Sequence, residues 1–488
     1  MSKIVTRLII TTTLLGALGF LLFTKIDQTP YHQADFYRNT LARIDSLAQR
    51  LKLQQQQLQE LQQRQIQDLP QSQKQSLQQV PEEGPAEEPA QPLEPVLDAP
   101  GLKAGWGKVN ITPPQPVRLT GKNFKPYEQV FDSVYVRTFM FDNGVNRVLM
   151  INYDLWIMHP KLANAVRNSI HKAFPEVTGI YFTANHSHTS IGGWASGLLG
   201  SLVVGGNSPE TLEFIIGQTL NSIRTAQRSL DVVRVGFGEV STEGLVTNRL
   251  DQNGHIDNLL RVLKLENQRH ELAVLNTFSA HSVYMDKDIN TLSADYPGAY
   301  LDLLEEQETI NFAAFAPGAT GSHTPIGRKP FELKKMIGYS RNLAGYFSDL
   351  QGKIKTQNTS VLKYVELPVD LRSPHFRISN YWRFRPWIFQ KIMGEMHPKI
   401  TVIRIGNTVL VGLPVELSGE FYPELQSFCQ QRGLSLMITS FNGWYLGYVN
   451  PERYYFTVSS AETREMNWFG PQNGEYFVEL TKRILDII

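Results

Sequence analysis

Hydrophobic positions are unevenly distributed along the chain, and the first group of them is a nearly uninterrupted apolar run at the N-terminus. Residues 8–23 form this run, and Lys3 and Arg7 precede it. Counted from Ile4, it has about the 20 residues that a helix needs to cross a bilayer. No convincing small-x-small cleavage site follows, so we expect an uncleaved signal anchor over residues 1–30. Its basic end would be cytoplasmic and the rest of the chain extracytoplasmic, either periplasmic or at the cell surface. The alternative is a cleaved signal peptide.

The next two segments are polar and differ from each other in pattern. Residues 31–68 are rich in glutamine, and their leucines and isoleucines recur at spacings of three, four and seven. This pattern predicts a helix with one narrow apolar stripe, a candidate coiled coil through which copies of the chain would form a homo-oligomer. Residues 69–100 are rich in Pro, Glu and Gln, a composition that cannot bury a core, so we expect a disordered linker. The two segments together would form a stalk that holds the rest of the chain away from the membrane.

Residues 101–488 alternate between short apolar runs and longer amphipathic segments, without a second linker. The expected strands are residues 147–152, 179–183, 232–237, 259–265, 272–278, 401–405, 408–413 and 436–440, and the expected helices are 160–174, 210–229, 296–306, 338–348 and 418–432. Such alternation predicts an α/β fold, in the form of a mixed α+β domain with layered sheets and helices. We therefore expect one large catalytic domain behind the anchor and the stalk.

Composition narrows the classes of function. Lys and Arg number 47 against 46 Asp and Glu, so the net charge gives no reason to expect a nucleic-acid partner. Cys429 is the single cysteine, which excludes an intramolecular disulfide and a cysteine-rich metal site. Neither GxGxxG nor GxxxxGK[ST] occurs, so the sequence offers no phosphate-binding glycine loop.

Candidate metal ligands follow several of the expected strands. The segment YFTANHSHTSIGGW places His186 and His188 two residues apart, so in extended conformation both imidazoles can point to one side. His281, Glu416 and Tyr448 each come just after another apolar run. Strand ends are where open α/β sheets build their sites, and neutral imidazole is the commonest zinc ligand. Two histidines, one carboxylate and an open position would make a catalytic zinc site.

Several segments in the same order resemble the neutral, non-lysosomal ceramidases, which are zinc-dependent amidases of N-acylsphingosines. AGWGKVNITPP resembles the family's opening segment, and NHSHTSIGG resembles its T-H-T-H-S-G-P-G-G motif. FSAHSVYM, LSADYPGAY, LPVELSGEF and GWYLGYVN resemble the segments F-x-x-H-P-T-S, S-S-D-N-K-G-Y, P-G-E-F and N-x-Y-T-x-Y-I-T. The resemblance extends from about Gly105 to Ile488. It implies a zinc cofactor and a lipid amide substrate, with ceramide as the first candidate.

The resemblance also implies roles for individual residues. His186 and His281 would be zinc ligands, and His188 would be a catalytic hydrogen-bonding or acid–base residue beside the metal. Glu416 would be the carboxylate ligand and Tyr448 the phenolic ligand. Two rivals remain open, because Glu420 also matches the letters G-E-F and Tyr445 lies close to Tyr448 in sequence.

One segment departs from the family pattern. Where the family has G-D-V-S-P-N with an essential serine, this chain has GSHTPI. Thr324 stands in place of the serine, Ser322 in place of the aspartate and Ile326 in place of the asparagine, while His323 is new. Thr324 and His323 are therefore candidate catalytic residues. The departure also leaves two alternatives: a non-catalytic, metal-bound envelope scaffold or lipid- or glycan-binding relative, and a hydrolase of another amide or ester.

Residues 381–394, YWRFRPWIFQKIMG, mix aromatic and basic side chains. Such a mixture suits a membrane interface, where indole rings lie at the level of the headgroups and cations meet anionic lipid. A buried aromatic cluster with a basic rim is an equally good interpretation of the sequence.

Overall fold

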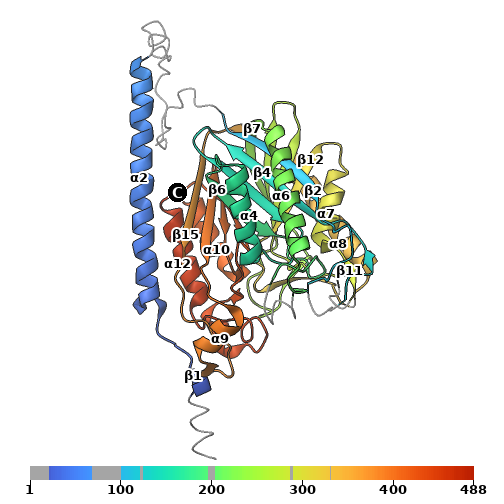
Figure 1. Cartoon of the computed structure of the whole chain (residues 1–488), viewed down its shortest axis with the longest axis vertical. Coiled ribbons are helices and arrows are strands. Elements are labelled where there is room, and N and C mark those ends of the chain that lie inside the picture. The colour runs from blue at the N-terminus through green and yellow to red at the C-terminus, as the bar shows by residue number, and fades with distance from the viewer. Residues whose placement is uncertain (1–20, 69–100, 121–124, 196–203, 286–288, 330) are drawn as a thin grey trace, which may run out of the picture.

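The computed structural model describes residues 21–68, 101–120, 125–195, 204–285, 289–329 and 331–488 (Figure 1). Most of the predicted anchor over residues 1–30, and the whole predicted linker over 69–100, lie outside these described residues. Within the described ranges, no helix combines the length and the apolarity that a bilayer span requires.

A mixed sheet of nine strands forms the centre of the fold. Its order is β12-β10-β9-β7-β2-β4-β5-β6, with β14 paired to β7. The strands are β2 (Lys103–Asn110), β4 (Tyr135–Asp142), β5 (Arg147–Tyr153), β6 (Gly179–Ala184), β7 (Asp231–Ser241), β9 (Leu259–Asn267), β10 (Leu272–Phe278), β12 (Ile310–Pro317) and β14 (Gln357–Asn358). The pairs β5–β6 and β10–β12 are parallel, and the other pairs are antiparallel. All six residues of β6 are buried, as expected for a parallel strand that is covered on both faces.

A second sheet packs against the first. It consists of β15 (Leu362–Pro368), β17 (Lys399–Ile405), β18 (Thr408–Gly412) and β20 (Ser435–Thr439), in the order β15-β17-β18-β20. Side chains from both sheets form one shared core, which includes Tyr181 and Leu275 from the large sheet and Ile403, Leu410 and Met437 from the small one. The two sheets thereby bring the ends of β6, β10 and β18 into one region.

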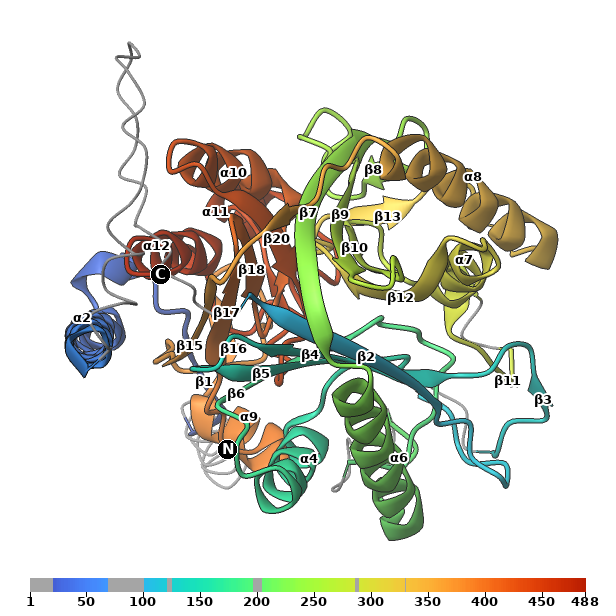
Figure 2. The same cartoon turned by 90° about the horizontal axis from the view of Figure 1, so that it is seen from above.

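Helices cover the outer faces of both sheets in three groups (Figure 2). α4 (Pro160–Ala173) and α6 (Pro209–Arg228) pack on the half of the large sheet that contains β4, β5 and β6. α7 (Asp295–Glu305) and α8 (Leu333–Gln351) cover the half with β9, β10 and β12, and α10 (Tyr422–Gln430) and α12 (Asn473–Leu485) cover the small sheet. The expected α/β fold with layered sheets and helices is confirmed.

The hydrophobic pattern missed the short strands and also four longer ones in the two sheets, β2, β4, β12 and β15. In β2 the reason is glycine, because Gly105 and Gly107 replace the apolar side chains that would mark a strand. A Cβ atom at Gly105 would lie 2.0 Å from the carbonyl oxygen of Ala226, and one at Gly107 would lie 2.2 Å from that of Ser222. Both carbonyls belong to α6, so the AGWGK segment allows the helix to lie directly on the strand.

The expected helix in residues 31–68 is present as α2 (Asp35–Asp68), but its first half lies along the body of the protein instead of standing away from it (Figure 1). Leu41, Leu47 and Leu51 pack against the core of the small sheet, and Ile44 is a buried member of that core. Thr40 accepts a hydrogen bond from Asp370 N at 3.1 Å. This part of the apolar stripe is therefore engaged within the chain.

The first described residues also lie on the body. β1 (Phe23–Lys25) pairs with β16 (Trp382–Phe384), and α9 (Pro386–Met393) follows β16 directly. Figure 1 shows β1 and α9 together at one end of the molecule. Residues separated by more than 350 positions in the sequence are thus neighbours at this end.

Candidate metal and catalytic site

Four segments bring the candidate ligands together. His186 and His188 follow β6, and His281 follows β10. Glu416 is the first residue of β19 (Glu416–Leu417), and Tyr448 is the first residue of β21 (Tyr448–Val449). His186, His281, Glu416 and Tyr448 are buried and His188 is partly buried, so the site lies inside the protein.

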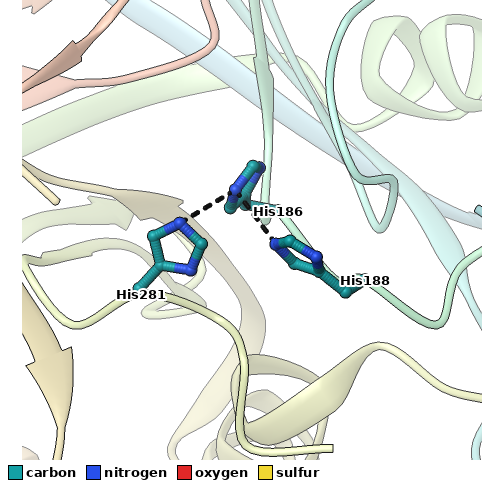
Figure 3. A group of neighbouring side chains, drawn as sticks. All are labelled: His186, His188 and His281. Carbon is teal, nitrogen blue, oxygen red and sulfur yellow. Dashed lines mark hydrogen bonds between the residues drawn. The ribbon is translucent and has the colours of Figure 1, made fainter. Parts of the chain in front are cut away.

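The three histidines form a compact group with His186 in the middle (Figure 3). His186 Nε2 lies 3.1 Å from His281 Nε2 and 3.3 Å from His188 Nε2. All three rings offer ligand atoms within 4.8 Å of one another, so this group can hold a metal ion. The H-x-H pair therefore brings both imidazoles together, but in a turn after β6 and not in the expected extended conformation, because His186 has φ of +68°. His188 is a third candidate ligand as well as a candidate acid–base group.

Glu416 and Tyr448 complete the cluster around His281. His281 Nε2 lies 2.9 Å from Glu416 Oε2 and 3.1 Å from Tyr448 Oη. Tyr445, the rival of Tyr448, donates its phenolic hydrogen to Glu416 Oε1 at 2.7 Å. The structure thus brings Tyr448 to a histidine ligand atom and Tyr445 to the carboxylate beside it.

Glu420, the rival of Glu416, lies in a different set of contacts. Its Oε1 accepts hydrogen bonds from Tyr454 Oη at 2.6 Å and from Asn248 Nδ2 at 2.9 Å, and its carboxylate pairs with Arg453. These partners already occupy the Glu420 carboxylate. Glu416 is the glutamate that contacts the histidines.

The environment keeps His186 and His281 neutral. Burial, and after it the charge of His281, holds the pKa of His186 well below its ordinary value. Burial, and after it the guanidinium of Arg249, does the same for the pKa of His281. Burial and the Glu416 carboxyl group raise the pKa of the Tyr448 phenol well above 10. A neutral imidazole keeps the lone pair that a metal requires.

The tautomer of His186 is fixed by a backbone contact. Its Nδ1 lies 2.6 Å from the carbonyl oxygen of Trp156, and a carbonyl can only accept, so Nδ1 carries the hydrogen. The lone pair is then on Nε2, which faces His281 and His188. Metal-binding histidines in proteins are commonly oriented in this way by a carbonyl or carboxylate on the far nitrogen.

The turn that carries His186 is held by a buried ion pair. His186 itself has φ of +68°, a strained conformation for a non-glycine residue. The preceding Asn185 donates to Asp154 Oδ1 at 2.9 Å, and Arg137 Nη1 donates to Asp154 Oδ2 at 2.7 Å. The Arg137 and Asp154 side chains are 1% and 0% exposed, so this network is rigid support beneath the ligand turn.

The donor set fits a metal of the zinc type. Two ligand nitrogens on one tetrahedral ion, each at roughly 2.1 Å, would be roughly 3.4 Å apart. The two Nε2–Nε2 distances of 3.1 and 3.3 Å are close to this separation. The cluster offers imidazole nitrogens and a carboxylate oxygen but no cysteine. Zinc accepts both of these ligand types.

The GSHTPI segment lies beside the site. Gly321 N donates to Leu417 O at 2.8 Å, which joins the segment to β19, and residues His323–Pro325 form strand β13. Thr324 Oγ1 is buried and has no hydrogen-bond partner among the described residues. Buried hydroxyls are usually hydrogen-bonded, so Thr324 Oγ1 can accept or donate a bond to a water molecule or a substrate group.

His323 is engaged in structural contacts instead. Asp257 N donates to its Nε2 at 3.0 Å, and Ser322 Oγ lies 2.9 Å from its Nδ1. Burial lowers the pKa of His323 to about 4. Ser322 in turn accepts hydrogen bonds from Ser418 Oγ at 2.8 Å and Gly419 N at 3.1 Å. Ser322 therefore holds the segment onto the residues that follow β19, and His323 holds it onto Asp257.

Arg249 is a site residue that the sequence analysis missed. Its guanidinium lies 5.2 Å from the centre of the Tyr448 ring and pairs with Glu462 at 3.0 Å. Its backbone N donates to Ser322 O at 2.8 Å, and its Nε is buried without a hydrogen-bond partner among the described residues. The only signal in the sequence is an arginine within a run of turn-forming residues, TNRLDQNG.

Comparison with known families agrees with the sequence resemblance. Residues 105–326 match the family model of neutral/alkaline non-lysosomal ceramidase, N-terminal. Over these residues the chain is similar to the neutral/alkaline non-lysosomal ceramidases, as the motifs predicted. The matched range contains His186, His188, His281 and Thr324, whereas Glu416 and Tyr448 lie beyond it.

Two solved structures share the fold. A neutral ceramidase from Pseudomonas aeruginosa matches with a TM-score of 0.68 and 18% sequence identity, over 79% of this chain and 74% of that chain. A ceramidase complexed with C2 matches with a TM-score of 0.67 and 18% identity, over the same shares of the two chains. No curated protein sequence matches the chain.

Proposed function

We propose that the protein is a zinc-dependent hydrolase that cleaves the amide bond of an N-acylsphingosine or a related lipid amide. The observation that carries this proposal is the convergence of His186, His281, Glu416 and Tyr448 in one buried cluster. The match to the ceramidase family model over residues 105–326 supports the reaction class.

In this proposal His186, His281, Glu416 and Tyr448 hold the zinc ion. When bound, zinc supplies a Lewis acid that polarises an amide carbonyl and activates water at neutral pH. The contact from Trp156 O to His186 Nδ1 keeps the ligand nitrogen aimed at the site. The burial of the cluster excludes bulk water, which strengthens every electrostatic interaction within it.

In this proposal, one neighbouring side chain transfers a proton and two others stabilise negative charge on the substrate. His188, whose Nε2 lies 3.3 Å from His186 Nε2, is our candidate for proton transfer to the leaving amine. The Thr324 hydroxyl and Arg249 Nε are buried donors without a hydrogen-bond partner among the described residues. Thr324 belongs to the segment that is joined to β19, and Arg249 lies beside the Tyr448 ring. Both suit the stabilisation of negative charge on the carbonyl oxygen of the substrate. The contacts of His323 favour a positioning role over proton transfer.

A second candidate function is a non-catalytic relative that binds metal and lipid or glycan at the cell envelope. The observation in its favour is the departure GSHTPI, in which Ser322 and His323 are both occupied by structural hydrogen bonds. A third candidate function is hydrolysis of a different amide or ester. The substrate panel described next distinguishes the three candidates.

The test is a substrate panel on the full-length chain in detergent or nanodiscs, loaded with zinc and checked for bound metal. Short- and long-chain N-acylsphingosines, other lipid amides and matched esters are incubated, and released fatty acid is measured. The His186→Ala/His281→Ala double variant is the control. We expect release from an N-acylsphingosine by the wild type alone. Zinc-loaded protein that cleaves none of the panel would favour the second candidate, and cleavage of another amide or ester alone would change the substrate.

We further propose that residues 1–30 anchor the chain in a membrane with the catalytic domain extracytoplasmic. The support is the basic end and the apolar run of residues 8–23. Membrane-impermeant labelling of single cysteines in a Cys429→Ser background, placed at exposed positions such as Lys353, tests the orientation. Labelling of intact cells is expected, whereas labelling only after lysis would contradict this orientation.

A further inference from the structure

Exposed apolar side chains gather at the end of the molecule where β16 and α9 lie. Among the described residues this group comprises Ile378, Tyr381, Trp382, Trp387 and Ile392, which are 42–62% exposed. We call these five residues the aromatic patch. Two exposed tryptophans close together are unusual on a protein surface that faces only water, and such patches mark a binding surface.

The N-terminal end of the described chain is fixed onto this patch. Phe23, Thr24 and Lys25 in β1 pair with Phe384, Arg383 and Trp382 in β16, and the rings of Phe23 and Phe384 lie 5.1 Å apart. Hydrogen bonds continue on both sides of this pair. Ile26 N donates to Tyr381 O, and Arg385 N donates to Leu22 O, each at 2.8 Å.

Two buried arginines strengthen this attachment. Arg383 Nε donates to Lys25 O at 3.1 Å, and Arg372 donates to the carbonyl oxygens of Asp27 at 2.8 Å and Thr29 at 2.6 Å. The apolar run of residues 8–23 therefore ends, in sequence, at a point that is fixed to the aromatic patch.

We propose that the aromatic patch rests in the interfacial layer of the lipid bilayer, the same bilayer that takes the N-terminal apolar run. Tryptophan and tyrosine favour the headgroup level of a bilayer, because their rings are apolar and carry one polar group. Lys25 and Lys391 are exposed beside the patch and would meet anionic headgroups. The folded body of residues 101–488 would then lie directly on the membrane. This differs from the expectation that residues 31–100 form a stalk that holds the body away from it.

The patch is connected to the candidate site by a short series of aromatic contacts. Phe389, on the buried face of α9, lies 5.5 Å from Trp468, ring centre to ring centre, and Trp468 lies 5.7 Å from Tyr445. Tyr445 donates to Glu416. α9 thus packs against the wall of the site, so a bilayer at α9 would hold the site close to the lipid surface. This last consequence, that a lipid substrate reaches the site from the bilayer, rests on the proposed function.

The position of the patch is tested without enzyme activity. The full-length chain is reconstituted into nanodiscs made with either ordinary or brominated lipid, and quenching of tryptophan fluorescence is measured. The chain has seven tryptophans. The Trp382→Phe/Trp387→Phe double variant removes the two in the patch and keeps its apolar character, while Trp106→Phe is the control for a buried tryptophan in β2. We expect brominated lipid to quench the wild type and Trp106→Phe, and most of this quenching to be lost in the double variant.

The N-terminal run keeps every variant in the nanodisc, so the quenching difference reports the patch and not membrane attachment as such. Equal quenching of the wild type and the double variant would overturn the proposal, because the patch would then be outside the bilayer. A second copy of the chain could cover the patch instead of lipid. A dimer in the native mass of the nanodiscs, together with patch tryptophans that brominated lipid does not quench, would also overturn the proposal.

A second experiment tests the consequence for the substrate. Trp387→Glu/Ile392→Glu should lower the turnover of a lipid amide embedded in vesicles several-fold and leave the turnover of a soluble short-chain amide unchanged. Equal turnover of the embedded lipid by this variant and the wild type would contradict delivery from the bilayer. If the wild type cleaves neither amide, the proposed function fails, but the quenching result still decides the position of the patch.

Discussion

Glu416 and Tyr448 are direct partners across the parallel strands β19 and β21, and both contact the same atom, His281 Nε2. They are far apart in the sequence, and the pairing depends on Gly447. Gly447 has φ of +75°, and its carbonyl oxygen accepts from Glu416 N at 2.9 Å. A Cβ atom at this position would lie 2.2 Å from the carbonyl oxygen of Met466, so only glycine fits.

The first prediction concerns metal retention. His186→Ala and His281→Ala should each abolish stoichiometric zinc binding, since each removes one of the proposed ligands. His397→Ala removes an exposed histidine outside the cluster and is the matched control. Bound metal is measured by elemental analysis after dialysis, with circular dichroism as the check of folding. Well-folded wild-type protein that stays metal-free in the presence of zinc would refute the ligand set.

The second prediction separates the two tyrosines. Tyr448→Phe removes the hydroxyl at 3.1 Å from His281 Nε2, whereas Tyr445→Phe removes only a hydrogen bond to Glu416. Removing a hydrogen-bond partner of a metal ligand, as in Tyr445→Phe, typically costs about 10- to 100-fold in metal affinity. Loss of a ligand itself, as in Tyr448→Phe, should cost more than this. Competition against a chelator measures both affinities. A larger loss for Tyr445→Phe would show that Tyr445 is the phenolic ligand.

The third prediction concerns the Thr324 hydroxyl. Thr324→Val keeps the branched shape and deletes the hydroxyl, so kcat should fall by about 100- to 1,000-fold with zinc retained, the size of effect seen for one oxyanion donor. Thr324→Ser restores the family residue and should preserve or raise activity on ceramide-like amides. Serine is less restricted at χ1, so its hydroxyl can adopt the same position. Equal rates for Thr324→Val and the wild type would make this hydroxyl a bystander, with Ser322 or His323 as the next candidate.

The fourth prediction is a pH dependence of stability. Burial lowers the pKa of His323 from about 6.5 to about 4, so between these pH values the unfolded chain binds a proton that the folded chain does not. The free energy of unfolding contributed by this residue therefore falls as the pH falls, by about 1.4 kcal/mol per pH unit.

His323→Gln removes this proton and should make the slope of the unfolding free energy against pH shallower by that amount. Urea unfolding at pH 6.5, 5.5 and 4.5 measures the slope, and the comparison with the wild type cancels the other titrating groups. His397→Gln, at an exposed histidine, should leave the slope unchanged. An unchanged slope for His323→Gln would contradict the lowered pKa.

Local patterns in the amino-acid sequence predicted many of the helices and strands and named the candidate metal ligands. Strand β10 and helices α4, α6 and α7 begin and end within one or two residues of their expected positions. Their apolar residues follow the period of a strand or a helix, and Pro residues mark the starts of α4 and α6. The ordered motifs predicted the resemblance that the family model also finds over residues 105–326, because each preserves residue types that the chemistry needs at a fixed distance from a strand end.

Which of the candidate residues contact one another depends on the tertiary fold. Glu416 and Glu420 have similar surroundings in sequence, but one contacts His281 and the other is occupied by Asn248 and Tyr454. The position of Arg249 is set by backbone pairing with the GSHTPI segment, which leaves no local pattern. In the same way, the stripe of α2 predicted a helix but not the surface it covers, because an apolar face is satisfied equally by a second copy or by the body of the same chain. Local periodicity specifies that a surface must be buried, and the partner that buries it depends on residues distant in sequence.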